Sequence, residues 1–263
     1  MIHCNRLFFA FLLLLAIGCG GKYDPATFQD GGNHTRPVGI TSECAQNSYK
    51  ALQSLWTPMP KHLENRDCVR ESSDFDVSRY FTALPHIRME DGYVLDYVYH
   101  FDGMGGYPIF YARKKEAPAF ASEKERSNAI DRREVIDWIP RIQADDSPEG
   151  YFELTLLAVF GQDFYLYWHA ISASKDFVYD QESLKNATRN IPSTTKFDAR
   201  KARKLDLRPT VTFSEDKATV VLYTFSAWAG IDRNTYCWNR NSPSERCESR
   251  RENVIPFDCN IIF

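Results

Sequence analysis

Two neighbouring aromatic segments constrain the fold of this chain more than any other feature. Residues 93–102 read YVLDYVYHFD, in which apolar and polar side chains alternate with a period of two. This alternation, with its aromatic enrichment, predicts a half-buried β-strand. A glycine cluster at 103–106 follows, and then residues 107–113 read YPIFYAR. We therefore expect a β-hairpin with a glycine-containing loop.

A second hairpin is predicted at residues 151–171. The runs YFELTLLAVF and FYLYWHAI flank residues 161–163. A three-residue loop groups the apolar side chains on one face better than a two-residue loop, so we favour that register. The opposite face then carries Glu153, Thr155, Tyr165, Tyr167 and His169.

The remaining segments predict a mixture of short helices and strands. Residues 42–56 have apolar side chains at three- and four-residue spacing, Ser42 can cap the start, and prolines at 58 and 60 end the pattern. Further helices are expected within 116–147 and near 180–190, and further strands at 209–214, 217–228, 236–238 and 254–263. Hairpins dominate and no βαβ alternation is present, so the expected class is α+β with a mostly antiparallel sheet.

The N-terminal segment has the features of a secretory signal. Residues 7–17 form an unbroken apolar run, preceded by a single charged residue, Arg6. A membrane span needs roughly 20 apolar residues, whereas a run of this length suits the central part of a signal peptide. We expect residues 1–18 to be a signal peptide and residues 41–263 to form a single α+β domain.

The apolar run ends in LAIGCGGK at residues 15–22. This sequence resembles the lipobox of bacterial lipoproteins, in which a peptidase cuts before the cysteine and the thiol then carries a diacylglycerol. Ala16 stands where leucine is commoner, and the small residues Ala16 and Gly18 also fit an ordinary signal-peptidase site. The resemblance is confined to this N-terminal segment.

The resemblance implies that the lipid bilayer is a partner of this protein through an acylated Cys19. Residues 20–39 are rich in Gly, Pro, Asp, Asn and Thr, which bury too little apolar area to order a chain, so residues 19–40 are expected to be a flexible tether. Several acyl chains hold a protein firmly on a membrane. The implied localisation is the cell envelope. No aspartate follows Cys19, which by the same resemblance implies the outer membrane of a Gram-negative cell.

Seven cysteines occur, of which Cys4 lies in the predicted signal. A secretory route permits disulfides, but their connectivity does not follow from sequence. Cys44 with Cys68, and two of the three C-terminal cysteines, are plausible pairs; the alternative is buried thiols, which pack as small apolar side chains. No pair has CxxC spacing, so we expect neither a zinc ribbon nor a thioredoxin-like site. The disulfide candidates are Cys44, Cys68, Cys237, Cys247 and Cys259.

His169 and Glu153 are the candidate catalytic residues, because the preferred register of the second hairpin makes them diagonal neighbours. A histidine beside a carboxylate can perform acid–base chemistry, and aromatic neighbours would shift its pKa. Such pairs are also common in structural networks, which is the interpretation we favour. No GxSxG, HExxH or SxxK motif supports a hydrolase.

Other polar patterns carry less information. Asp96, His100 and Asp102 share one face of the first predicted strand, but residues four apart in a strand are about 13 Å apart, so we favour a solvated face and expect no metal or cofactor. Residues 196–208 hold six basic and two acidic residues. They suit anionic headgroups or, as we favour, a solvated linker. A net charge of −3 gives no general attraction for nucleic acid.

The sequence therefore favours an exported, lipid-anchored binding or structural module over an enzyme. Tyrosines offer a large contact area at low entropic cost, and those on uncovered strand faces would form the binding surface. The alternative is an exported hydrolase that uses the pair formed by His169 and Glu153. The candidate surface tyrosines are Tyr97, Tyr99, Tyr165 and Tyr167.

Overall fold

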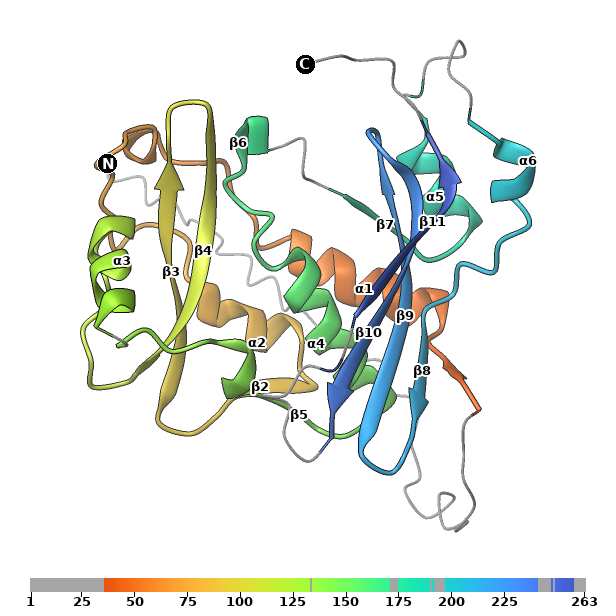
Figure 1. The fold of residues 1–263 in the computed structure, drawn as a ribbon, viewed down its shortest axis with the longest axis horizontal. Coiled ribbons are helices and arrows are strands. Elements are labelled where there is room, and N and C mark those ends of the chain that lie inside the picture. The colour runs from red at the N-terminus through yellow and green to blue at the C-terminus, as the bar shows by residue number, and fades with distance from the viewer. Residues whose placement is uncertain are drawn as a thin grey trace, which may run out of the picture.

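Two antiparallel sheets lie on opposite sides of a central helix, α4 (Figure 1). The computed structural model describes residues 36–132, 134–170, 175–189, 191, 197–240, 247 and 249–257. The α+β class and the predominance of antiparallel hairpins are confirmed.

The larger sheet is built mostly from the C-terminal half of the chain, with the short N-terminal strand β1 at one edge. Its strands follow the order β1-β8-β9-β10-β11, with β7 pairing β9 beside β8. Strand β10 pairs with β9 along its whole length. The strands predicted at 209–214 and 217–228 are confirmed as β8 and β9, whereas β10 begins six residues before the strand predicted at 236–238 and β11 begins four residues before the strand predicted at 254–263. The bounds are β1 Val38–Gly39, β7 Asp176–Val178, β8 Thr210–Phe213, β9 Lys217–Ser226, β10 Gly230–Asn239 and β11 Arg250–Pro256.

The aromatic hairpin forms the smaller sheet. Strands β3 (Tyr93–Phe101) and β4 (Gly105–Lys114) pair antiparallel, as predicted, and β6 (Tyr167–Trp168) joins β4. At the turn Gly103 has φ +90°, and the Asp102 carboxylate accepts from the backbone N–H groups of Met104 and Gly105. A separate two-stranded sheet pairs β2 (Ile87–Met89) with β5 (Ile142–Ala144), a strand that the sequence did not predict.

Helix α1 follows the predicted apolar spacing. It begins after Thr41, one residue before the predicted cap, and the Thr41 hydroxyl accepts from the Cys44 N–H at 3.1 Å. In the described ranges, short 3₁₀ helices cover Lys61–Leu63, Val77–Arg79 and Ile139–Arg141. The α-helices are α1 Ser42–Gln53, α2 Tyr80–Ala83, α3 Glu123–Asp131, α4 Pro148–Phe160, α5 Gln181–Ala187 and α6 Ala199–Ala202.

The strand predicted over residues 151–160 is wrong, because this segment is helix α4. The Ser147 hydroxyl caps the helix by accepting from the Gly150 N–H at 2.9 Å, and Pro148 occupies the first turn. Most of its side chains are buried, including adjacent residues such as Phe152 and Glu153. A helix enclosed on all sides has no polar stripe, so the 3.6-residue period that identifies helices is absent.

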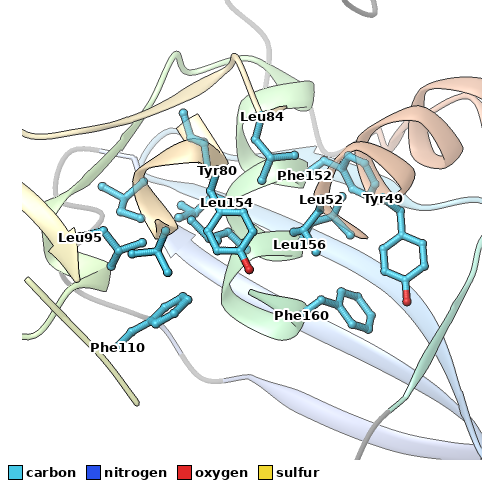
Figure 2. Close-up of a cluster of buried hydrophobic side chains, with 14 of the residues drawn as sticks. Tyr49, Leu52, Tyr80, Leu84, Leu95, Phe110, Phe152, Leu154, Leu156 and Phe160 are labelled. Carbon is cyan, nitrogen blue, oxygen red and sulfur yellow. The ribbon is translucent and has the colours of Figure 1, made fainter. Parts of the chain in front are cut away.

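Side chains of α4 occupy the centre of the hydrophobic core. Figure 2 shows them between α1 on one side and strands β3 and β4 on the other. The Tyr49 and Phe160 rings meet edge to face with centroids 5.1 Å apart, a favourable aromatic geometry. Full burial of each such side chain stabilises the fold by roughly 1.5–3 kcal/mol. The labelled core residues are Tyr49, Leu52, Tyr80, Leu84, Leu95, Phe110, Phe152, Leu154, Leu156 and Phe160.

The predicted tether boundary lies inside the folded part, because Val38 and Gly39 pair with β8. The described part of the basic segment contains α6, whereas a plain linker was expected. Residues 1–35, with Cys19, and residues 258–263, with Cys259, lie outside the described residues. Within the described ranges no helix combines the length and apolar character needed to cross a membrane.

Candidate functional site

The predicted pair of His169 and Glu153 does not form across a hairpin, because Glu153 belongs to helix α4. Glu153 is buried and its carboxylate accepts from the backbone N–H of His86 at 2.8 Å. His169 is exposed beside β6, where its backbone N–H donates to the Met104 carbonyl and its ring lies against Trp168. The structure therefore places a different histidine, His86, next to Glu153.

His86 lines a surface pocket of about 440 Å³. The pocket is formed by the segment that enters β2, the segment that leaves β5, the start of α4 and the end of β10. Elements distant in sequence therefore converge on it, and each belongs to a sheet or to the central helix. Its lining residues are Pro85, His86, Ile87, Arg88, Gln143, Ala144, Asp145, Asp146, Tyr151 and Arg240.

A hydrogen bond to Asp145 orients the His86 ring. The His86 Nδ1 lies 2.7 Å from Asp145 Oδ2, and the Asp145 N–H extends the β2–β5 ladder by donating to the His86 carbonyl at 3.1 Å. The other carboxylate oxygen of Asp145 accepts from the backbone N–H and hydroxyl of Ser147. Burial alone lowers the pKa of His86, but the Asp145 hydrogen bond and nearby carboxylates outweigh it and raise the pKa.

Gly150 permits this close arrangement. A β-carbon at position 150 would overlap Asp145 Oδ1 and would lie 3.2 Å from the Asp145 nitrogen and 3.3 Å from the His86 carbonyl oxygen. Only glycine fits at position 150, because the first turn of α4 passes directly against the pair formed by His86 and Asp145.

Glu153 lies behind His86 in the protein interior. Burial raises the pKa of its carboxyl to about 7, although the hydrogen bond from the His86 N–H and the charge of His86 partly oppose this shift. The carboxyl therefore changes protonation near neutral pH. It supports the backbone of His86 and is not among the residues that line the pocket.

Asp146, Arg240 and Tyr151 also line the pocket. Asp146 adopts φ +59°, a left-handed conformation that aspartate tolerates better than most residues. Both its carboxylate oxygens accept from Arg240, at 2.9 and 2.6 Å, and the Tyr151 hydroxyl donates to one of them at 3.1 Å. The hydrogen bond from Arg240 lowers the pKa of Asp146. The Arg240 guanidinium also lies 5.0 Å from the Phe213 ring centre.

The polar residues predicted on strand β3 have separate structural roles. Asp96 accepts from Arg70 and Arg113 and is buried, so the solvated face expected here is wrong at this position. His100 lies 3.9 Å from Glu123 and its ring is tilted against that of Tyr107, while Asp102 caps the hairpin turn. Within the described ranges no group of three His, Cys, Asp or Glu side chains is arranged to hold a metal ion.

The predicted tyrosine surface is wrong at three of its four positions. Tyr97 and Tyr99 are buried because both faces are covered in the middle of β3, and Tyr165 is buried where its hydroxyl accepts from the Phe75 N–H. Tyr167 is partly buried. The large apolar side chains that are exposed near the end of this sheet are Met104, Tyr107 and Trp168.

One of the candidate disulfides forms. Cys237 in β10 is bonded to Cys247, which precedes β11. The suggested bond between Cys44 and Cys68 is absent, and both side chains are buried. Burial raises the pKa of the Cys68 thiol.

The pocket residues were missed because the sequence brings them together only through the fold. Asp146-Ser147-Pro148-Glu149 is a helix-start pattern, with a capping serine, proline in the first turn and an acidic residue, and it would have identified α4. His86 and Arg240 carry no local pattern. Comparisons with models of protein families, with curated proteins and with solved structures gave no match for this chain.

Proposed function

We propose that this protein is an exported lipoprotein, anchored to the cell envelope through Cys19, whose folded domain is a ligand-binding module. The Cys237–Cys247 disulfide is the observation that carries the proposal. Disulfides form and persist in oxidising compartments and are rare in the cytosol. The disulfide therefore supports export independently of the apolar N-terminal run and the lipobox resemblance.

The pocket beside His86 is the proposed ligand site. Concave surfaces with a few convergent polar groups are the usual places where small molecules bind. The polar groups here are held in place by sheet pairing and by the hydrogen bonds between His86 and Asp145 and between Arg240 and Asp146. Such preorganisation reduces the entropy that a ligand loses on binding.

The hydrogen bonding of the Ser147 hydroxyl, beside the pair formed by His86 and Asp145, favours a binding role over covalent catalysis. Nucleophilic catalysis requires a hydroxyl or thiol activated by a neighbouring base. Ser147 donates its hydroxyl hydrogen bond to Asp145 rather than to His86. In the described part of the chain no serine, threonine or cysteine side chain is hydrogen-bonded to the His86 ring.

A second candidate function is hydrolysis with His86 as general base, which the His86–Asp145 geometry favours over the predicted use of His169. A carboxylate that orients the imidazole leaves the other ring nitrogen for a water molecule. Hydrolysis of an ester by the purified protein that His86→Gln abolishes and His169→Gln preserves would support this candidate. Equal loss in both variants would contradict it.

Acylation of the two N-terminal cysteines tests the anchoring. Cells that express the full chain are grown with labelled palmitate, and Cys19→Ser is compared with Cys4→Ser as a matched control. The label is expected in the unaltered chain and in Cys4→Ser, and it is expected to be lost in Cys19→Ser. Label that persists without Cys19, or that is absent from the unaltered chain, would contradict the proposal.

A further inference from the structure

We propose that the pocket beside His86 binds the anionic group of a small ligand, a carboxylate or a phosphate, through Arg88, Gln143 and His86. This inference rests on the proposed function, because it names the ligand class of the same site. It follows from which polar groups of the pocket are already used by the protein and which remain for a ligand.

The pocket carboxylates are occupied by internal donors. Asp145 accepts from the His86 ring and from the N–H and hydroxyl of Ser147. Asp146 accepts twice from Arg240 and once from Tyr151. A carboxylate has about four acceptor positions, so these two groups have little capacity left for a cationic or donor ligand.

The groups that remain are mainly donors. The Arg88 guanidinium is 67% exposed and its nearest carboxylate, Asp91, is 3.9 Å away, which is beyond hydrogen-bond distance. The Gln143 side chain and the second nitrogen of the His86 ring, Nε2, have no hydrogen-bond partner among the described residues. Arg240 also has N–H groups beyond the three that donate to Asp146 and Ser214.

Strand pairing brings these donors to one face. Arg88 lies directly opposite Gln143 in the β2–β5 register, and directly opposed residues in a sheet have neighbouring side chains. His86 lies in the turn directly before β2, and the hydrogen bond from the Asp145 N–H to its carbonyl holds it beside the segment that leaves β5. The donors therefore converge on the same pocket, as its lining confirms.

The charge of the pocket agrees with an anionic ligand. Arg88 and Arg240 balance Asp145 and Asp146, so protonated His86 makes the lining net positive. The other charged groups that face His86 are Glu149 and Glu153 on α4. Glu153 is buried behind the His86 backbone, where it does not compete with a ligand in the pocket.

Titration of the acylated protein in detergent with inorganic phosphate, acetate and methylammonium tests this inference. The measurement is calorimetric and is made at about pH 6, where histidine is largely protonated. Arg88→Gln is the test variant, and Arg208→Gln is the control, because Arg208 is similarly exposed but pairs with Asp206 outside the pocket. Unfolding curves confirm that both variants are folded.

We expect phosphate or acetate to bind the unaltered protein and the Arg208→Gln variant equally, and to bind Arg88→Gln at least about tenfold more weakly, since a hydrogen bond to a charged group contributes roughly 1.5–3 kcal/mol. Phosphate binding with acetate excluded assigns the site to phosphate, and the reverse assigns it to carboxylate. Equal anion affinity in both variants overturns the inference. Preference for methylammonium overturns the anionic ligand class but leaves a binding pocket. If none of the three ions binds, the anion site is overturned and the pocket no longer supports the proposed function.

Discussion

Individual buried polar groups determine how this protein responds to its environment. Glu153 and Asp163 are both desolvated enough that burial raises the pKa of each carboxyl to about 7. Glu153 has a clear structural role, since it accepts from the His86 backbone. Sequence alone identified Glu153 as important but gave it the wrong partner, because partner identity depends on whether residue 153 lies in a strand or a helix.

The free energy of unfolding is expected to fall between about pH 4.5 and pH 7. The folded protein keeps protons on Glu153 and Asp163 that the unfolded chain has released, so each rise in pH across this window favours unfolding. Glu153→Gln removes the contribution of Glu153 to this decline, at most about 3 kcal/mol. The amide oxygen of the variant still accepts from the His86 N–H. Urea unfolding at several pH values should show a shallower decline in the variant. Parallel declines would contradict the raised pKa of Glu153.

Two neighbouring tyrosines of β3 should respond oppositely to removal of the hydroxyl. The Tyr97 hydroxyl is buried without a hydrogen-bond partner among the described residues, whereas the Tyr99 hydroxyl donates to the Tyr165 carbonyl at 2.6 Å. Tyr97→Phe is expected to leave stability unchanged or to increase it by up to about 1 kcal/mol. Tyr99→Phe is expected to cost about 1–2 kcal/mol. Urea denaturation measures both, and an equal cost in the two variants would refute this difference.

At the level of elements, those with a clear hydrophobic period or cap could be predicted, and the central helix could not. The aromatic hairpin β3–β4, helix α1 and strands β8 to β10 show periodicity or capping that sequence reveals. Helix α4 lacks a polar face because it is enclosed by α1 and both sheets, and its β-branched and aromatic content resembles a strand. Since α4 supplies Tyr151 to the pocket and Glu153 behind it, this error concealed part of the candidate site, and His86 and Arg240 had no local pattern to reveal the rest.

The cap of α4 gives a direct test of its helical assignment. Ser147→Ala removes the hydroxyl that accepts from the Gly150 N–H, and it is expected to lower the free energy of unfolding by about 1 kcal/mol. Ser54→Ala is the control, because the exposed Ser54 hydroxyl donates to the Ala51 carbonyl at the C-terminal end of α1. Loss of this hydroxyl should cost less than about 0.5 kcal/mol. Equal, negligible effects in urea unfolding would contradict the cap.

For the whole molecule, the sequence predicted the class but not the enclosure of α4 between two sheets (Figure 1). The pocket depends on that enclosure, because Arg240 reaches Asp146 across 94 residues of sequence. No local pattern encodes a contact of this range. The disulfide could be predicted in part. Both cysteines were candidates, but their pairing depends on the return of β11 beside β10.

Reduction of the Cys237–Cys247 disulfide should destabilise the domain without unfolding its core. The bond closes a loop across a sequence separation of 10 residues, for which chain entropy predicts roughly 3 kcal/mol. Guanidinium unfolding with and without reductant measures this loss. The double variant Cys237→Ala/Cys247→Ala is the control and should be insensitive to reductant. Reductant sensitivity that survives in the double variant would place the effect elsewhere.

The intact mass of the protein isolated from its own cells, before and after reduction and thiol alkylation, tests the central claim most directly. We predict a chain that begins at Cys19 and carries the added mass of acyl groups, with the Cys237 and Cys247 thiols alkylated only after reduction. A chain that carries no lipid at Cys19 would contradict the anchored lipoprotein. Alkylation of Cys237 and Cys247 in the unfolded protein without reduction would contradict the disulfide that supports export.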